Sequence, residues 1–333
     1  NTSLVYVNRI GGEGSYLYAG GSMALNAAGS VLCQLPYFEE ESKTVDLQLL
    51  ESYDDEKPSI VELVYKALVM GIREYFHKNG LKKALIGLSG GIDSAIVAVL
   101  AVDALGGENV RGVMLPSQYS SDHSINDAVA LAKNLGMPYD IVPIQDMFDQ
   151  MKKTLSPIFA GMPEDVTEEN MQARIRGSLL MAISNKTGAI LLNTSNKSEA
   201  AVGYGTLYGD SCGALSVIGD IYKTEVYELA EYINRDEERI PRNTIEKAPS
   251  AELRPDQKDS DSLPDYNKLD EILSMLIEEE MCYDEICEEI DDHELVARVL
   301  KMVRNNEHKR LQTAPVLKIS PTTFRLDRKM PIA

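Results

Sequence analysis

The fold is decided by the stretch ALIGLSGGIDSA, residues 84–95. A short apolar run leads into a turn of serine and glycine, and a segment rich in alanine and valine follows. This order predicts a buried strand over Ala84–Leu88, a tight turn, and a helix over Ala95–Leu105. Glycine lets backbone N–H groups approach an anion closely, and a helix start adds unpaired N–H groups and the positive end of the helix dipole. The stretch therefore predicts a phosphate site at a strand-to-helix turn.

The side chains of this turn indicate which kind of anion it would hold. Ser89 and Ser94 supply hydroxyl donors at its two edges. Asp93 would repel a bare phosphate, so its carboxylate favours a Mg²⁺ ion that bridges phosphates. The Gly-Lys-Ser/Thr that ends a Walker A loop does not follow this turn. The third glycine of a dinucleotide-binding fingerprint is also missing. A glycine turn capped by serines, without any ligand, is the alternative that these residues leave open.

Short apolar runs alternate with helical patterns after this turn. Further strands are predicted over Val110–Leu115, Ile141–Ile144 and Ala189–Asn193. Helices are predicted between them, over 122–135 and about 168–186. Strands that alternate with helices form a parallel sheet. The predicted fold class is therefore α/β, a parallel sheet with helices on both faces.

The beginning of the chain has a different pattern, a short β segment. Residues 3–8 fit a buried strand, and residues 22–33 fit a hairpin. So few short strands cannot bury a core alone. We therefore expect residues 1–50 to be the end of a domain whose beginning is missing. Residues 51–57, in an acidic stretch, are expected to be a linker, and residues 58–333 the main domain.

The main domain is expected to contain a long helix, an irregular segment and two later helices. The first helix is predicted to begin near Pro58 and to end at Asn79. Four prolines interrupt a polar stretch over 241–264, which we interpret as a loop that covers a substrate and is mobile without ligand. Helices are predicted to resume at about 266–280 and 292–305.

Composition limits the classes of partner. The chain has 333 residues, 52 acidic and 33 basic, and a net charge of −19. An acidic chain repels phosphate backbones, so no nucleic-acid partner is expected. No run of about 18 apolar residues occurs, so no membrane span is expected. Four cysteines at spacings that match no zinc or haem pattern, and no leader sequence, favour a cytoplasmic location.

Longer segments carry a resemblance to a known family. The turn SGGIDS, residues 89–94, resembles the pyrophosphatase loop of the N-type ATP pyrophosphatases. Five further segments make the chain similar to the glutamine-dependent NAD synthetases of that superfamily: NMQARIR (170–176), LNTSNKSE (192–199), VGYGTLYGD (202–210), KAPSAELRP (247–255) and EHKR (307–310). The resemblance covers essentially the whole chain, and residues 1–50 resemble the last strands of the nitrilase-like glutaminase domain of that class. It implies an adenine nucleotide alpha hydrolase-like fold.

The resemblance implies roles for individual residues. Asp93, Glu199 and Lys223 would be catalytic, and Asp93 and Glu199 would hold Mg²⁺. ATP would contact Gly87, Leu88, Ser89, Gly90, Gly91, Ile92, Asp93, Ser94, Thr194, Lys223 and Ser250. Deamido-NAD would contact Asn170, Arg174, Glu199, Tyr204, Gly205, Thr206, Leu207, His308 and Lys309. Two positions depart from the ammonia-dependent relatives: Ser250 stands where they usually have threonine, and Leu207 where they often have lysine, which favours the glutamine-dependent class.

The implied reaction has two steps. The nicotinate carboxylate of deamido-NAD attacks the α-phosphate of ATP, pyrophosphate leaves into the loop Ser89–Ser94, and ammonia then attacks the adenylated carbonyl to give NAD and AMP. In this class a cysteine of the nitrilase-like domain releases ammonia from glutamine, and Cys33 does not resemble that nucleophile. The chain as given is therefore expected to use free ammonia. A homodimer or a higher homo-oligomer is expected from the resemblance.

Two other functions remain open at this point. One is another adenylylating ATP pyrophosphatase, such as a tRNA-thiolating enzyme, against which the net charge of −19 and the lack of paired catalytic cysteines speak. The other is a non-catalytic module that binds ATP. Formation of AMP and NAD from ATP, ammonium and deamido-NAD would distinguish NAD synthesis from both.

Overall fold

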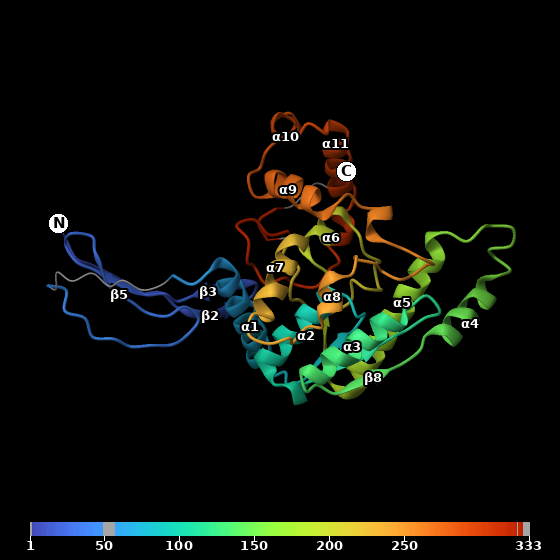
Figure 1. Cartoon of the computed structure of the whole chain (residues 1–333), viewed down its shortest axis with the longest axis horizontal. Coiled ribbons are helices and arrows are strands. Elements are labelled where there is room, and N and C mark those ends of the chain that lie inside the picture. Colours follow the sequence, from blue (N-terminus) through green and yellow to red (C-terminus); the bar gives the residue numbers. More distant parts are fainter. Residues whose placement is uncertain (1, 49–56, 325, 329–333) are drawn as a thin grey trace.

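A parallel sheet lies at the centre of the molecule. The computed structural model describes residues 2–48, 57–324 and 326–328 (Figure 1). Within these ranges the sheet has five strands, in the spatial order β10 (Leu215–Ser216), β9 (Ile190–Asn193), β6 (Ala84–Gly87), β7 (Val110–Met114) and β8 (Tyr139–Ile141). All neighbouring strands are parallel, as predicted. This order puts β6, and the turn that follows it, in the middle of the sheet.

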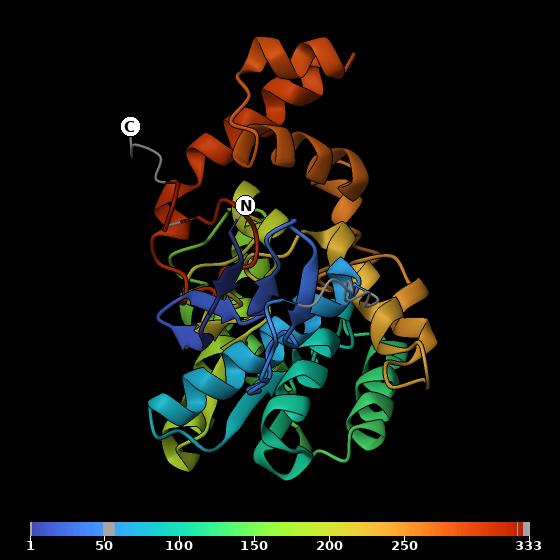
Figure 2. The ribbon, with the colours of Figure 1, turned by 90° about the vertical axis from the view of Figure 1, so that its left-hand side faces the viewer.

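Helices cover both faces of the sheet, which confirms the predicted fold class (Figures 1 and 2). Alternate side chains of β6 point to opposite faces, as the strand period requires. Ala84 and Ile86 belong to a core with α1 (Ile60–Lys78), α2 (Ile92–Leu105), α3 (Asp122–Asn134), α7 (Lys223–Ile233) and α8 (Arg242–Glu246). Leu85 belongs to a second core with α4 (Gln145–Leu155) and α5 (Val166–Thr187).

A third core lies above the carboxyl edge of the sheet. It joins α6 (Lys197–Val202), α9 (Tyr266–Ile277), α10 (Tyr283–Glu289) and α11 (His293–Asn305), and the short helix α12 (Glu307–Arg310) follows α11. Figure 1 shows α9, α10 and α11 together at the top, above α6. The predicted helices over 266–280 and 292–305 are confirmed as α9 and α11, whereas α10 was not predicted.

The N-terminal strands form two small antiparallel sheets. One contains β1 (Leu4–Tyr6), β4 (Met23–Leu25) and β5 (Val31–Gln34), and the other is a hairpin of β2 (Ile10–Glu13) and β3 (Tyr16–Ala19) that packs on α1. The pairing of β4 with β5 confirms the predicted hairpin. The predicted burial of residues 3–8 is wrong: Leu4 is 56% exposed and Val7 79% exposed. In the described part of the chain β1 is an edge strand that pairs only with β4, and all three of its residues are exposed.

Most predicted boundaries hold within a few residues. Helix α1 is capped by Ser59, one residue after Pro58, and ends at Asn79 as predicted. Strand β8 begins two residues before the predicted Ile141–Ile144 and ends at Ile141, because Ile144 is already the N-cap of α4. Helix α2 begins at Ile92 instead of Ala95. This last difference places Asp93 inside the first turn of the helix.

No helix in the described ranges is both long enough and apolar enough to cross a membrane. The predicted linker over 51–57 falls almost entirely outside those ranges.

Candidate active site

The turn after β6 is held by its two serine side chains. The Ser89 and Ser94 hydroxyls lie 3.1 Å apart, and Ser94 Oγ donates to the Gly91 carbonyl at 3.0 Å. The backbone N–H of Gly91 donates to Ser89 Oγ at 3.1 Å. Gly91 caps α2 without any side-chain hydrogen bond. The first N–H groups of α2 therefore have no capping side chain, which suits them to an anion.

Gly90 brings this turn against the start of α3. Its φ is +79°, and a Cβ at this position would lie 2.2 Å from the carbonyl oxygen of Ser124. A backbone oxygen cannot yield as a side-chain tip can. Only glycine therefore fits between the turn and α3.

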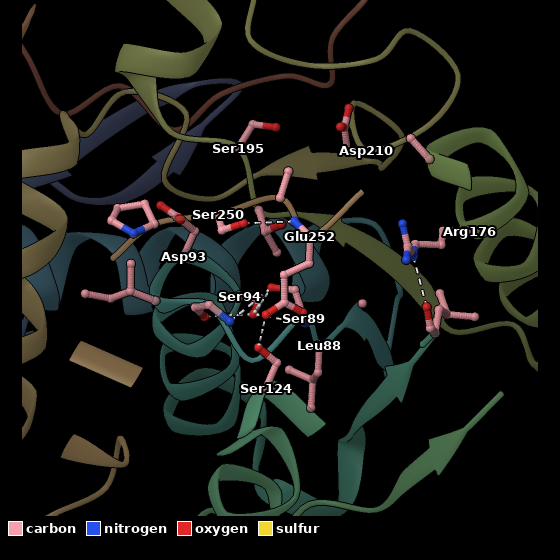
Figure 3. A pocket seen from close by; sticks show the side chains of 18 of the residues that line it. Leu88, Ser89, Asp93, Ser94, Ser124, Arg176, Ser195, Asp210, Ser250 and Glu252 are labelled. Carbon is pink, nitrogen blue, oxygen red and sulfur yellow. Dashed lines mark hydrogen bonds between the residues drawn. The ribbon is translucent and has the colours of Figure 1, made fainter. Parts of the chain in front are cut away.

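A cavity of about 320 Å³ opens above this turn, at the carboxyl edge of the sheet (Figure 3). Open α/β sheets bind ligands at this edge. The cavity is lined by twelve of the residues proposed from the sequence: Gly87, Leu88, Ser89, Gly91, Ile92, Asp93, Ser94, Thr194, Glu199, Tyr204, Lys223 and Ser250. The structure thus brings together every residue assigned to ATP except Gly90, which lies in the turn below.

The three residues predicted to be catalytic meet in one wall of the cavity. Lys223, at the first position of α7 and 2% exposed, donates through Nζ to Asp93, and Nζ lies 3.7 Å from Glu199 Oε1. Asn196 Nδ2 donates to the other oxygen of Asp93 at 2.9 Å. One ammonium thus faces two carboxylates, each from the first turn of a different helix.

Burial and mutual charge set the protonation of this group. Burial works to lower the pKa of Lys223, but the carboxylates of Asp93 and Glu199 outweigh it, so this pKa lies above its usual value. Burial and then the Asp93 carboxylate raise the pKa of Glu199 to about 8, against the lowering effect of Lys223. Lys223 therefore stays charged at neutral pH, and a second cation nearby would favour the charged form of Glu199.

A buried hydrogen-bond network supports this wall from behind. Ser198 Oγ accepts from the backbone N–H of Lys223 at 2.9 Å and donates to Asp270 of α9. The other Asp270 oxygen accepts from the backbone N–H of Thr224 at 2.9 Å. Ser198 and Asp270 therefore join α6, which carries Glu199, to the start of α7, which carries Lys223.

The residues assigned to deamido-NAD form a second group beside the cavity. Thr206 Oγ1 donates to Asn170 Oδ1 at 2.7 Å, and Arg174 Nε donates to the carbonyl of Leu207 at 3.2 Å. Lys309 Nζ donates to the carbonyls of Gly203 and Gly205, each at 2.8 Å. Except for Glu199 and Tyr204, these assigned residues do not line the cavity itself.

His308 is the assigned residue with the fewest contacts to that group. It is exposed, and its Nδ1 lies 3.1 Å from the carbonyl of Asn305 in its own helical region. Its neighbour Lys309 is the one that reaches the loop 203–207. The prediction of a deamido-NAD contact for His308 stays a prediction.

Several charged residues of the cavity have no counterpart in the sequence prediction. Among the described lining residues, five are acidic and three are basic. The additional ones are Arg176, Asp210, Lys247, Glu252 and Asp259. Arg176 donates through Nε to the carbonyl of Leu115 at 2.9 Å, on the opposite side of the cavity from Asp93 (Figure 3). Burial lowers the pKa of Arg176 to about 10, which leaves it charged at neutral pH.

The predicted covering loop over 241–264 forms one wall of the cavity. Glu252 accepts hydrogen bonds from the hydroxyls of Ser121 and Ser124 at 2.9 and 2.7 Å, at the start of α3. Farther along, Asp259 accepts from Tyr204 Oη at 3.1 Å and from Tyr266 Oη at 3.0 Å. The loop is therefore fastened to the domain at two points, and its mobility stays a prediction.

The acidic side chains near the phosphate turn can be compared with the ligands that a magnesium ion prefers. No group of three or more His, Cys, Asp or Glu side chains that could hold a metal by itself occurs in the described part of the chain. Asp93 and Glu199 offer two carboxylates beside the phosphate turn. Mg²⁺ is commonly bound by one or two carboxylates together with substrate phosphates and water. The residues present fit that mode of binding.

Comparisons with known proteins show which family the chain is similar to. The model of the NAD synthase family matches residues 64–313. The glutamine-dependent NAD(+) synthetase of Synechocystis is 47% identical over 345 residues, which include 100% of this chain and 61% of that protein. The chain thus spans about three fifths of the length of this curated relative.

Two solved structures are also similar. One is the glutamine-dependent NAD+ synthetase from Acinetobacter baumannii in complex with adenosine diphosphate, with a TM-score of 0.69, 38% identity and coverage of 99% of this chain and 61% of that chain. The other is the NH3-dependent NAD synthetase from Campylobacter jejuni in complex with nitrate, with a TM-score of 0.61, 31% identity and coverage of 78% of this chain and 99% of that chain.

Proposed function

We propose, because this chain belongs to the NAD synthase family, that it converts deamido-NAD to NAD with ATP and ammonia. The observation that carries the proposal is the position of Asp93, Glu199 and Lys223 beside the turn Ser89–Ser94, in one cavity. A phosphate turn with a charged centre at its edge suits nucleotidyl transfer. Glutamine is the proposed source of ammonia in full-length relatives of the glutamine-dependent class.

In the first step the chain would position two substrates for adenylylation. A carboxylate oxygen of deamido-NAD forms a bond to the α-phosphorus of ATP, and the bond from that phosphorus to the bridging oxygen breaks. The electron pair leaves with pyrophosphate. The N–H groups at the start of α2, with the hydroxyls of Ser89 and Ser94, would stabilise the charge that develops there. Thr194 and Ser250 line the same cavity and are proposed to orient ATP.

In the second step ammonia attacks the activated carbonyl carbon, the bond to AMP breaks, and one proton is lost. The group around Asn170, Arg174, Thr206 and Lys309 is proposed to hold deamido-NAD so that its nicotinate end faces the α-phosphate. Positioning alone can supply a large part of the rate increase. No protein nucleophile is needed.

Asp93 and Glu199 are proposed to hold Mg²⁺. The excess of acidic over basic residues in the cavity wall supports this assignment, because a triphosphate would otherwise enter a negatively charged site. When bound, Mg²⁺ neutralises charge on the phosphate oxygens of ATP.

The division of the chain is also a proposal. We propose a synthetase domain over 58–333 and, over 1–50, the C-terminal end of a nitrilase-like glutaminase domain, joined by residues 51–57. The separate antiparallel sheets of the first 48 residues support it. A homodimer or higher homo-oligomer and a cytoplasmic location are proposed from family resemblance, and light scattering after size exclusion would test the oligomer.

The function is tested by incubating the 333-residue chain with ATP, Mg²⁺, ammonium and deamido-NAD, and separating the products by chromatography. NAD and AMP should appear in equal amounts. Asp93→Asn should lower AMP formation by roughly 100-fold, because the carboxylate beside the phosphates is lost. Asp236→Asn, at a side chain that is 79% exposed, is the matched control and should keep full activity.

The same assay separates the alternatives. A chain that binds ATP but forms no AMP would be a non-catalytic module, and AMP formation that depends on tRNA would indicate a thiolating enzyme. Replacing ammonium by glutamine tests whether these residues alone can use glutamine. The family match and the named relatives favour NAD synthesis over both alternatives.

A further inference from the structure

We propose that Lys247 is a further phosphate-contacting residue, which holds the pyrophosphate of ATP at the turn Ser89–Ser94. The inference rests on the proposed function and adds a residue that has no assigned role in it. Lys247 lies in the covering loop and lines the cavity. It is a positively charged side chain on the side of the cavity where phosphate is expected.

The position of Lys247 is fixed by contacts with the start of α3. Its Nζ lies 3.1 Å from Ser124 Oγ. The backbone of the same Ser124 lies against Gly90 so closely that a Cβ on Gly90 would be 2.2 Å from its carbonyl oxygen. Ser89 and Ser124 both line the cavity, and Figure 3 shows them next to each other. The ammonium group therefore stands at the rim of the phosphate turn.

The other two basic residues of the cavity wall have closer polar partners than Lys247. Lys223 is held between Asp93 and Glu199. Arg176 donates to Leu115 on the far side of the cavity. Lys247 has a looser ion pair, with its Nζ 3.6 Å from Asp127 Oδ2. Among the described lining residues it is thus the cation best placed for the phosphate turn.

The chemistry of the leaving group gives this cation a task. When the bond from the α-phosphorus to the bridging oxygen breaks, negative charge accumulates on pyrophosphate. The turn itself offers neutral N–H and O–H dipoles, and Asp93 at its end is negative. An ammonium group forms charge-assisted hydrogen bonds, which are about twice as strong as neutral ones. Lys247 would therefore stabilise pyrophosphate more than it stabilises AMP.

A purely structural role for Lys247 is the competing interpretation. Glu252 also contacts Ser124 Oγ, so Lys247 could serve as the counter-charge of Glu252 and Asp127 that fastens the loop. The two roles differ in what a substitution changes. Loss of a counter-charge loosens the loop and lowers the stability of the protein. Loss of a phosphate contact weakens the binding of pyrophosphate and leaves the binding of AMP unchanged.

The test compares Lys247→Met and Lys247→Arg with the unmodified 333-residue chain. Binding of pyrophosphate and, separately, of AMP is measured by titration calorimetry with Mg²⁺ present, and thermal unfolding is recorded for each variant. Lys186→Met is the control, because Lys186 is exposed in the last turn of α5. We expect Lys247→Met to weaken pyrophosphate binding by roughly 10- to 100-fold. Lys247→Arg should restore most of it, and AMP binding should stay the same.

Unchanged pyrophosphate binding by Lys247→Met would overturn the inference. If this variant also melted at a lower temperature, Lys247 would be assigned to anchoring the loop. Equal weakening of AMP and pyrophosphate would also overturn it, because a general loosening of the cavity would then be the cause. Failure of the proposed function would be seen in a different measurement: the unmodified chain would bind pyrophosphate but form no NAD.

Discussion

Gly90 and Gly136 are two glycines with the same backbone requirement and different surroundings. Their φ angles are +79° and +62°. A Cβ on Gly136 would have no atom within 4 Å, whereas a Cβ on Gly90 would collide with the backbone of Ser124. Comparison of the two therefore separates backbone strain from the close approach that shapes the phosphate turn.

Gly136→Ala should cost about 1–2 kcal/mol of unfolding free energy, because an L-residue is strained in the left-handed region. Its ATP affinity should stay unchanged. Gly90→Ala should in addition displace the turn, and we expect AMP formation to fall roughly 100-fold. Urea unfolding and the product assay measure both effects. Equal activity of the two variants would show that the contact with Ser124 does not shape the site.

At the scale of single residues, only a local pattern allows a prediction from the sequence. The turn SGGIDS has such a pattern, and the structure puts it in the cavity wall. Asp259 lies in no such pattern, and Arg176 and Lys247 lie in quoted segments without an assigned role; only the fold brings these three side chains to the cavity. Their roles depend on contacts between distant parts of the chain, which no short sequence window contains.

At the scale of elements, the starts of α6 and α7 are joined by one small side chain. Ser198 Oγ links the backbone N–H of Lys223 to Asp270 of α9. Ser198 is fully buried and Asp270 is 5% exposed. The relative position of Glu199 and Lys223 therefore depends on a hydrogen bond between helices.

Ser198→Ala should lower the unfolding free energy by about 1–3 kcal/mol, because the N–H of Lys223 and one oxygen of Asp270 lose their partner. It should also lower kcat while the KM for ATP stays nearly constant, since the phosphate turn is not touched. Thr187→Ala, at an exposed position at the end of α5, is the control. A change in KM alone would contradict this assignment.

Strands with largely apolar, buried sequences could be predicted, and helices that bury a single side chain could not. Strands β6, β7 and β9 were expected within one residue, because most of their residues are apolar and buried. Helix α4 buries only Phe148 completely and α10 only Ile286. Such short helices depend on tertiary contacts, so their own sequence gives little signal.

At the scale of the whole molecule, a buried ion cluster holds the last described residues on the domain. Lys197 is fully buried and lies between Asp220 and Glu278. Its Nζ also donates to Ser320 Oγ at 2.7 Å, and Asp220 accepts from the backbone N–H of Ile319 and of Ser320 at 2.8 Å. The segment after α12 is therefore tied to α6, to the loop before α7 and to the end of α9.

Lys197→Met should lower the unfolding free energy by about 3 kcal/mol or more, because two carboxylates remain buried without their cation. Lys152→Met removes an ion pair with Glu164 at the surface, with 37% and 62% of the side chains exposed, and should cost less than about 1 kcal/mol. Denaturant titration of both variants gives the comparison. Similar losses would mean that the buried cluster is not an anchor.

The order of the cavity residues along the chain affects how the protein is made. The cavity is lined by residues from Gly87 to Asp259, and the helices that support α6 follow only after Asp265. During synthesis the phosphate turn emerges long before the lysines that complete its surroundings. A growing polypeptide has no complete nucleotide site until most of the domain has left the ribosome. Under the proposed function, cellular ATP would therefore stabilise the finished domain and could not guide the earliest stages of its folding.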